Sequence, residues 1–589
     1  MSGFVAIIAD DPGAPVSLAD ADAFAASYVA VRGGVAEAVN AGERARAFEV
    51  RSLEDTRPSI VRRGEAWALA AGAPHHPDSL ISAPLEDIEG QFALLRYDPQ
   101  AGTITLASDP FGMFALFLAR RGPFTYASTS ALALARHLAA PPSRLGLQTF
   151  LLAGYQCGNL TGWEGIERVG AAMSLAFHSD GHTATTYWRP YVDRAIRGLS
   201  LAASVDRCLE AAVEAVRAAG AGRDLLWCDL TGGYDTRILA LLAREAALPF
   251  VTATNGQGDE EDAALARRLA ERAGWEWTLL SLPSSWPEEI GSRLHEALGW
   301  GDGALEVGQL SGVLWRHAWK AARSRAVLNG GGGEHYWSYA WQHEYGRSNR
   351  SGSTNLDLWV RTRMLRAVSM RVFAGDPMPQ VTSDLRRRMQ PIVEPYQDEP
   401  RSVQADLLYL HKSTGHFGAY ASAAAGYVDL LLPFYTRASF TAAFSTNPRY
   451  RFGHRFYRRL IERLDPALAA IGTAKGGPAA PARLGNLLAF APYYARLAEK
   501  GLNKVVQRGL GRSFRRPPGL GESAARARAA MVAQVGTSLD TWRSLPLYDP
   551  RALHEMLIAA GRPDFPDSVL LGRVLTAELA LRAADAALA

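Results

Sequence analysis

A glycine turn between two apolar runs constrains the fold of this chain more than any other stretch. Residues 225–228 are apolar, residues 238–242 form an apolar, helix-like run, and Gly232 and Gly233 lie between the two runs. This order predicts a buried strand, a tight turn and a helix whose first backbone amides face the turn. Such turns suit anions, because glycines let the backbone approach a phosphate and a helix N-terminus offers unpaired N–H groups.

The side chains around this turn favour a phosphate and metal site. Thr231 and Thr236 offer hydroxyl groups, and the Asp235 carboxylate is a hard oxygen ligand that suits Mg²⁺. The spacing excludes the Walker loop and the dinucleotide fingerprint. The turn instead resembles the pyrophosphate-binding S-G-G-x-D-S loop of the N-type ATP pyrophosphatases, with threonine replacing both serines. The resemblance implies that ATP is bound by Leu230, Thr231, Gly232, Gly233, Asp235 and Thr236. The simpler alternative is an ordinary turn between a strand and a helix.

Composition indicates a globular protein with more than one domain. The chain has 589 residues, of which 48% are hydrophobic and 21% charged. A net charge of +4 gives no reason to expect a nucleic-acid partner. The three cysteines form no C-x-x-C pair, and no apolar run approaches the roughly 20 residues that cross a bilayer. We therefore expect a cytoplasmic protein with no membrane partner.

Residues 1–195 are predicted to form the first domain. Alternating segments at 92–97 and 103–107 predict strands. Residues 90–93 and the D-x-x-G turn at 109–112 resemble the glutaminase domain of class II amidotransferases, which implies an αββα (Ntn hydrolase-like) sandwich. That family begins Met-Cys-Gly and uses the cysteine to release ammonia from glutamine, whereas this chain has Ser2. A hydroxyl is a far weaker nucleophile than a thiol, so we expect a domain retained for structure; an acylase-like Ser2 is the alternative.

Residues 196–589 are predicted to form the second domain, a doubly wound parallel sheet with many helices. Strands at 225–228 and 250–254 are each followed by a helix, which implies a parallel sheet with ligands at the carboxyl ends of its strands. A third strand at 325–328 leads into a glycine-rich segment that ends in Glu334 and His335. This segment resembles the asparagine synthetase motif S-G-x-G-x-D-E, which lies opposite the first loop and completes a magnesium and pyrophosphate site.

The resemblance implies roles for particular residues in this second domain. Asp235 and Glu334 would bind Mg²⁺, and the second loop would contact ATP through Asn329, Gly330 and Gly331. Asn255, at the end of the second strand, would pass the adenine or else be a plain strand end. His335 stands at the position of the family's second acid and is either a catalytic residue or a packed ring.

Three further residues are candidates for the chemistry itself. Lys475 lies in a glycine-flanked loop where the family has a lysine that stabilises the developing charge; the alternative is a surface lysine. Glu344 and Asp357 are candidate bases for the attacking amine, with solvated helix carboxylates as the alternative.

The resemblance to the asparagine synthetase family implies a reaction as well as a site. A substrate carboxylate attacks ATP to give an acyl-adenylate and pyrophosphate, and an amine then displaces AMP. Because glutamine hydrolysis is expected to be lost, the amine would belong to the substrate. Two branches without the cysteine are lasso peptide cyclases and β-lactam synthetases. Chain length and the Arg-rich, aromatic region after residue 335 favour the cyclase, which implies a precursor peptide, a leader peptidase and a leader-binding protein. A non-catalytic nucleotide-binding relative is the other alternative.

Overall fold

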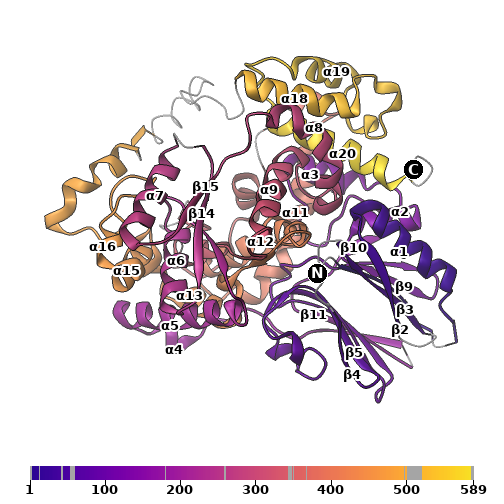
Figure 1. The fold of residues 1–589 in the computed structure, drawn as a ribbon, viewed down its shortest axis with the longest axis horizontal. Helices are drawn as coiled ribbons and strands as arrows, with labels where there is room; N and C mark the ends of the chain where they lie inside the picture. Colours follow the sequence, from indigo (N-terminus) through magenta and orange to yellow (C-terminus); the bar gives the residue numbers. More distant parts are fainter. Residues whose placement is uncertain are drawn as a thin grey trace.

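The structure is a computed structural model that describes most of the chain in two domains. It describes residues 3–11, 13–40, 44–52, 60–179, 181–257, 260–342, 348, 350–365, 368–496, 498–499 and 521–585. Figure 1 shows the N-terminal strands gathered at one end of the molecule and a second sheet, surrounded by helices, at the other. The chain leaves the last N-terminal strand at Thr186 and enters the first long helix of the second domain at Leu201.

Two antiparallel sheets face each other in the N-terminal domain. One has the order β10-β8-β9-β1-β3-β2 and the other β12-β11-β7-β6-β5-β4. The strands of the first sheet are β1 (Gly3–Ala9), β2 (Val35–Asn40), β3 (Ala45–Arg51), β8 (Phe117–Arg121), β9 (Phe124–Ser128) and β10 (Ile166–Arg168). Those of the second are β4 (Ile60–Arg63), β5 (Ala66–Pro74), β6 (Gly90–Asp98), β7 (Thr103–Ser108), β11 (Met173–His178) and β12 (Gly181–Thr186).

Strand β1 shows why the sequence forms a layered sandwich. Side chains alternate between the faces of a strand, and Phe4 and Ile8 point into the core between the two sheets. Val5 and Ile7 point to the opposite face, where helices α1 (Leu18–Arg32) and α2 (Ala131–Leu138) pack. The outer face of the second sheet packs against Leu80, Leu85 and Ile88, which lie in the segment that follows the 3₁₀ turn η1 (Pro77–Ser79) and contains the 3₁₀ turn η2 (Leu85–Asp87). The predicted pair of sheets is confirmed.

The second domain is built on a parallel sheet with the order β15-β14-β13-β16-β17. Its strands are β13 (Leu226–Asp229), β14 (Phe250–Asn255), β15 (Trp277–Leu280), β16 (Ala326–Leu328) and β17 (Asp429–Leu431). Leu226 and Cys228 of β13 pack against α5 (Leu201–Gly220) and α6 (Asp235–Glu245) on one face, and Trp227 packs into a separate cluster on the other. Both faces are buried, so the sheet is doubly wound as predicted.

The strand order places the two glycine-rich loops side by side. From β13 the chain adds β14 and β15 on one side and later adds β16 and β17 on the other. The order therefore reverses between β13 and β16, and ligands of doubly wound folds bind outside the carboxyl ends of the strands at such a point.

Many helices surround the parallel sheet and join it to the N-terminal domain. They are α3 (Arg144–Ala153), α4 (Arg194–Arg197), α7 (Glu261–Ala273), α8 (Trp286–Gly301), α9 (Val307–Ala321), α10 (Leu356–Trp359), α11 (Met378–Val393), α12 (Arg401–Ala424), α13 (Arg437–Ser445), α14 (Pro448–Arg451), α15 (Arg455–Leu464), α16 (Pro466–Ala469), α18 (Glu522–Val535), α19 (Pro550–Ala559) and α20 (Ser568–Ala584). One hydrophobic cluster runs from β1 through α8 to α20, so the two domains share a core.

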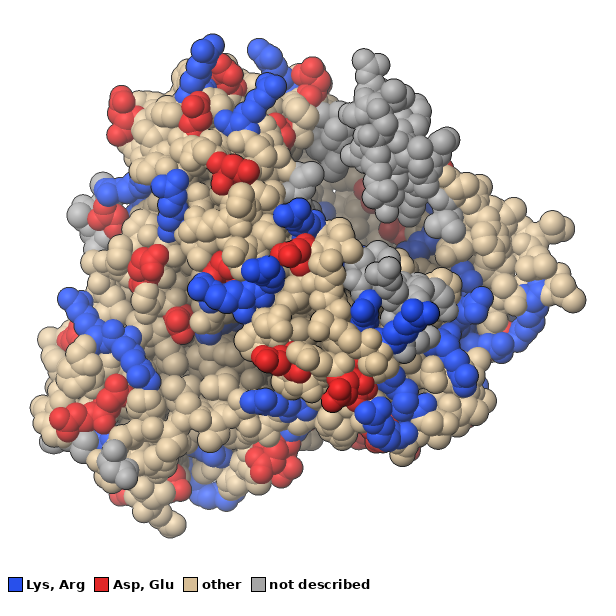
Figure 2. All heavy atoms as spheres, turned by 180° about the vertical axis from the view of Figure 1, so that it is seen from behind, with Lys and Arg blue, Asp and Glu red and all other residues tan. Residues whose placement is uncertain are grey.

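The surface carries both signs of charge. Figure 2 shows Lys and Arg side chains interspersed with Asp and Glu side chains across one face of the molecule. Among the described residues, no helix combines the length and the apolar character needed to cross a bilayer.

Candidate active site

The first loop is a turn with internal hydrogen bonds that leads straight into a helix. The Thr231 N–H donates to Thr236 Oγ1 over 3.0 Å, and the Gly233 N–H donates to Thr231 Oγ1 over 3.1 Å. The Gly232 N–H donates to Asp262 of α7 over 3.2 Å. Tyr234, the N-cap of α6, provides no side-chain hydrogen bond to the first turn of that helix. The start of α6 therefore offers backbone donors to an anion, as predicted for a phosphate loop.

The second loop follows β16 and lies directly against the first. Asn329 shapes this loop, since its Oδ1 accepts the Gly331 N–H over 2.9 Å. A Cβ at Gly333 would lie 2.4 Å from Asp235 Oδ1 and 2.3 Å from the Tyr457 hydroxyl. Glycine is therefore required at position 333 for the two loops to meet, and this contact brings Glu334 close to Asp235.

Asp235 and Glu334 form a pair of facing acids. Burial raises the pKa of Asp235, although the hydrogen bond from Tyr457 and the charge of Lys475 lower it. Burial and the neighbouring Asp235 charge raise the pKa of Glu334 to about 7, against a hydrogen bond from Tyr409. Glu334 Oε2 is buried and has no hydrogen-bond partner within the residues that the structure describes. Two facing carboxylates, one with an unpaired oxygen, fit a shared cation.

The acid pair suits Mg²⁺ held jointly with phosphate. The part of the chain that the structure describes has no group of three or more His, Cys, Asp or Glu side chains arranged to hold a metal. Mg²⁺ is commonly bound through one or two carboxylates together with substrate phosphates rather than in a protein cage. Asp235 and Glu334 would supply those carboxylates.

Lys475 lies at the same site, within a group of aromatic rings. Its Nζ is 2.9 Å from Nε2 of His454 and 4.6 Å from the ring centroid of Trp337. The Tyr234 ring centroid is 5.8 Å away. Because the charge of Lys475 lowers the pKa of Asp235, the ammonium group and the acid pair belong to one site.

Tyr457 is a site residue that sequence reasoning missed. Its hydroxyl lies 2.5 Å from Asp235 Oδ1 and 2.7 Å from the Gly333 carbonyl oxygen, so it links the two loops. It projects from α15, which also presents Arg458, whose Nε donates to the Tyr234 hydroxyl over 3.2 Å. The available signal was a polar and aromatic first turn in an amphipathic helix, which says nothing about what that turn contacts.

The structure also places three further candidates: Asn255, His335 and Asp357. Asn255 is exposed at the carboxyl end of β14, next to β13, and its adenine contact stays a prediction. The His335 ring packs against Phe440 (4.8 Å between centroids), and burial lowers its pKa to about 3, so the ring is neutral. A catalytic role for His335 stays a prediction. Asp357 is exposed on α10, 3.7 Å from Arg386. Glu344 lies outside the described residues.

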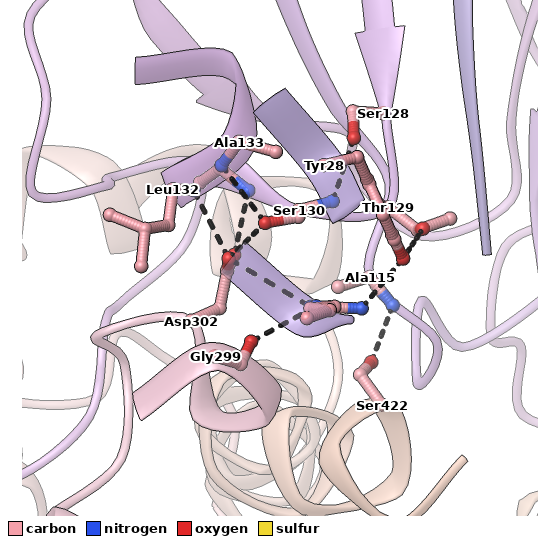
Figure 3. Close-up of polar contacts among 12 residues, drawn as sticks. Tyr28, Ala115, Ser128, Thr129, Ser130, Leu132, Ala133, Gly299, Asp302 and Ser422 are labelled. Carbon is pink, nitrogen blue, oxygen red and sulfur yellow. Dashed lines mark hydrogen bonds and ion pairs between the residues drawn. The ribbon is translucent and has the colours of Figure 1, made fainter. Parts of the chain in front are cut away.

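Hydrogen-bonded side chains occupy the space beside Gly3, the first residue of β1. A Cβ at Gly3 would lie 2.0 Å from the Tyr28 hydroxyl and 2.1 Å from Thr129 Oγ1. The hydroxyl oxygens of Tyr28 and Thr129 lie 2.9 Å apart. Figure 3 shows the contact between these two side chains. Arg32 donates to the Tyr28 hydroxyl over 2.9 Å and to the Gly299 carbonyl oxygen of α8 over 3.0 Å. This end of β1 is therefore tied to the second domain. Ser2 itself lies outside the described residues.

The predicted D-x-x-G turn is present in the N-terminal domain and has a structural role. Asp109 is buried, and its carboxylate accepts the backbone N–H groups of Phe92, Phe111, Met113 and Phe114 at 2.8 to 3.3 Å. Burial raises the pKa of Asp109 to about 6, against those four hydrogen bonds. The turn fixes the segment that connects β7 to β8.

Two family models match separate parts of the chain. A family model described as a glutamine amidotransferase domain matches residues 82–188, and one described as asparagine synthase matches residues 206–464. No curated protein matches the chain. Among solved structures, the glutamine phosphoribosylpyrophosphate amidotransferase from B. subtilis, complexed with ADP and GMP, is 11% identical with a TM-score of 0.21, over 42% of this chain and 65% of that one. A structure of the allosteric regulatory enzyme of purine biosynthesis is 11% identical with a TM-score of 0.23, over 49% of this chain and 77% of that one.

The two family matches follow one another along the chain in the order of the two observed domains. The asparagine synthase match contains both glycine-rich loops and both facing acids. An amidotransferase-like domain followed by an asparagine synthase domain places this chain in the asparagine synthetase-like family, as an ATP-dependent amide ligase.

Proposed function

We propose that this protein forms an amide within a single substrate, as lasso peptide cyclases do. It would adenylate the side-chain carboxylate of an Asp or Glu in a precursor peptide, and the N-terminal amine of that peptide would then close a macrolactam. The observation that carries this proposal is the identity of the residue before β1. Ser2 stands where amidotransferases have cysteine, and Tyr28 and Thr129 fill the space beside Gly3. With no thiol to release ammonia from glutamine, an amine carried by the substrate itself would serve as the nucleophile.

The first step activates the carboxylate. A carboxylate oxygen attacks the α-phosphorus of ATP, the bond from that phosphorus to the β-phosphate oxygen breaks, and the products are an acyl-adenylate and pyrophosphate. The N–H groups at the start of α6 and the Thr231 hydroxyl would bind the pyrophosphate. Lys475 would stabilise the negative charge that develops on the phosphate oxygens. Mg²⁺ held by Asp235 and Glu334 would supply charge neutralisation on the phosphates.

The second step forms the amide. The amine nitrogen attacks the acyl carbon, the bond between that carbon and the AMP oxygen breaks, and the amine proton passes to a base. Glu344 is the proposed base, since Asp357 is exposed and lies beside Arg386. Water must be kept away from the adenylate. The segment carrying Phe490 and Tyr493 suits this task, because both rings lie within 5.2 Å of the Arg458 guanidinium beside the first loop.

The proposal implies particular partners. A cyclase of this type takes a precursor peptide and would work with a leader peptidase and a leader-binding protein in the cytoplasm, where ATP is available. Neither a nucleic acid nor a membrane is needed for the reaction.

The test is a reaction of the full-length protein with ATP, Mg²⁺ and synthetic peptides that carry Asp or Glu at varied distances from a free N-terminus. We expect AMP and pyrophosphate in equal amounts, together with a peptide that has lost one water. The matched control is the same peptide with an acetylated N-terminus, which cannot close the ring. Ring closure of a small amino acid derivative alone would assign a β-lactam synthetase-like activity instead. Absence of pyrophosphate with every substrate would favour a non-catalytic relative.

A further inference from the structure

The imidazole ring of His454 lies between rings from both glycine-rich loops. His454 directly precedes α15. One face of its ring stacks on Tyr234 of the first loop, with centroids 4.6 Å apart and planes at 14°. The other face stacks on Trp337, which follows the second loop, at 4.2 Å and 28°. Stacking on both faces fixes the plane of the imidazole and confines its ring nitrogens to that plane.

One of those nitrogens contacts the lysine of the proposed reaction. Nε2 of His454 is 2.9 Å from Nζ of Lys475. A lysine ammonium only donates hydrogen bonds, so we assign Nε2 as the acceptor, which makes the imidazole neutral with its proton on Nδ1. Lys475 also lies 4.6 Å from the Trp337 ring centroid, a second contact that suits a cation. The two contacts hold a flexible side chain in one direction.

The neutral character of the acceptor is significant. A carboxylate in the place of His454 would hold Lys475 equally well, but it would cancel the positive charge that the reaction needs. A neutral imidazole holds the ammonium group and leaves its charge available to the phosphate side of the site. Asp235 already responds to that charge, because Lys475 lowers its pKa.

We propose that His454 is a positioning residue for Lys475: its neutral imidazole, stacked between Tyr234 and Trp337, accepts a hydrogen bond from the ammonium group and holds that group at the phosphate site. The inference rests on the proposed adenylation, in which Lys475 stabilises developing charge. His454 does not itself touch the reacting atoms.

A histidine elsewhere in the chain provides a matched control. His137 of α2 stacks on Phe24 with centroids 4.7 Å apart and planes at 20°. Its Nε2 lies 3.1 Å from Asp20 Oδ1. It is therefore a stacked histidine with a polar contact, but it lies in the N-terminal domain and away from the two loops. Replacing it tests the loss of a stacked imidazole without touching the site.

The experiment compares His454→Phe, His454→Gln and His137→Phe in the full-length protein. Phenylalanine keeps the stacking and loses the acceptor, whereas glutamine keeps an acceptor and loses the stacking. In the adenylation assay we expect His454→Phe to lower kcat by about 10- to 100-fold, because a displaced catalytic group costs rate more than binding. KM for ATP should change less than about threefold, and His454→Gln should retain more activity than His454→Phe. His137→Phe should leave kcat unchanged.

A second measurement keeps this inference separate from the proposed function. Modification of Lys475 by an amine-reactive reagent, followed by mass spectrometry of the intact protein's digest, reports the contact without any turnover. We expect faster labelling of Lys475 in His454→Phe than in the parent, and no change in His137→Phe. Unchanged labelling, or activity retained by phenylalanine and lost with glutamine, would show that His454 only packs. If the parent protein releases no pyrophosphate, the proposed function fails, while the labelling result still decides on the contact.

Discussion

Two clusters of buried polar groups, one at the domain junction and one at the loops, differ in how fully their hydrogen bonds are satisfied. At the junction, Asp302 accepts hydrogen bonds from Ser130 Oγ (2.5 Å), the Ala131 N–H (2.7 Å) and the Leu132 N–H (3.1 Å). Figure 3 shows this carboxylate at the start of α2. Arg32 lies 3.8 Å away and balances its charge. Every contact of this carboxylate is favourable.

At the loops, the carboxylates face each other instead. Asp235 raises the pKa of Glu334, and Glu334 Oε2 has no hydrogen-bond partner in the part of the chain that the structure describes. A buried polar group without a partner costs free energy, and groups of like charge cost more. The cluster around Asp302 therefore stabilises the fold, whereas the cluster of Asp235 and Glu334 is arranged for a ligand.

The same substitution at the two aspartates should separate these roles, and the largest effect is expected at Asp235. Asp235→Asn replaces one proposed carboxylate ligand of Mg²⁺ with a neutral amide and removes the charge that faces Glu334. We expect the rate of pyrophosphate release to fall at least about 100-fold, because a metal-assisted step loses an anionic ligand. The melting temperature should stay equal or rise, since a buried like-charge contact is lost. If Asp235→Asn were destabilised yet fully active, Asp235 would serve the stability of the fold and not the binding of Mg²⁺.

Asp302→Asn should show the reverse pattern. Asp302 has a left-handed backbone with φ of 58°, which asparagine tolerates, so the change tests the charge and the hydrogen bonds alone. The amide nitrogen cannot accept, so at least one donor at the start of α2 loses its partner, and Arg32 loses its counter-charge. We expect the free energy of unfolding to fall by about 1–3 kcal/mol in urea denaturation. Activity per folded molecule should not change. A loss of activity at full stability would show that Asp302 contributes to the reaction as well as to the fold.

Parts of the structure that depend on local pattern were predictable from the sequence. Apolar strands followed by helices specify a parallel sheet, and the carboxyl ends of its strands meet at one edge. That is why Asp235 and Glu334, about 100 residues apart in the chain, were expected to face each other, and the structure brings them together. Lys475 was also expected at this site, and its charge does reach Asp235.

Residues whose role depends on how distant elements dock were not predictable. Tyr457 and His454 reach the loops only because the first turn of α15 packs against them, and no local pattern encodes that contact. The glycine-rich motif of the second loop also does not specify the direction in which each of its side chains points. Gly333–Tyr336 forms a 3₁₀ turn, in which successive side chains point about 120° apart. Glu334 therefore faces Asp235, while His335 points into an aromatic cluster.

The smallest effect that we expect is a pH dependence of Mg²⁺ binding at Glu334. Because burial and Asp235 raise the pKa of Glu334 to about 7, ionising this carboxyl costs stability in the metal-free protein as pH rises from its ordinary value toward 7. Below pH 7 a cation has to displace that proton, so the apparent Mg²⁺ affinity should rise by up to about tenfold per pH unit and level off above pH 7.

Thermal unfolding with and without Mg²⁺ measures this dependence. Saturating Mg²⁺ should add about 1–3 kcal/mol at pH 8 and clearly less at pH 6, since the stabilisation follows RT ln(1 + [Mg²⁺]/Kd). Glu334→Gln should abolish the pH dependence, whereas Asp302→Asn should lower the unfolding temperature at both pH values and leave the Mg²⁺ increment intact. Equal stabilisation of the parent at pH 6 and pH 8 would mean that the cation does not compete with the Glu334 proton. Glu334 Oε2 would then serve a ligand other than Mg²⁺, and metal binding would not explain why the acid pair differs from the cluster around Asp302.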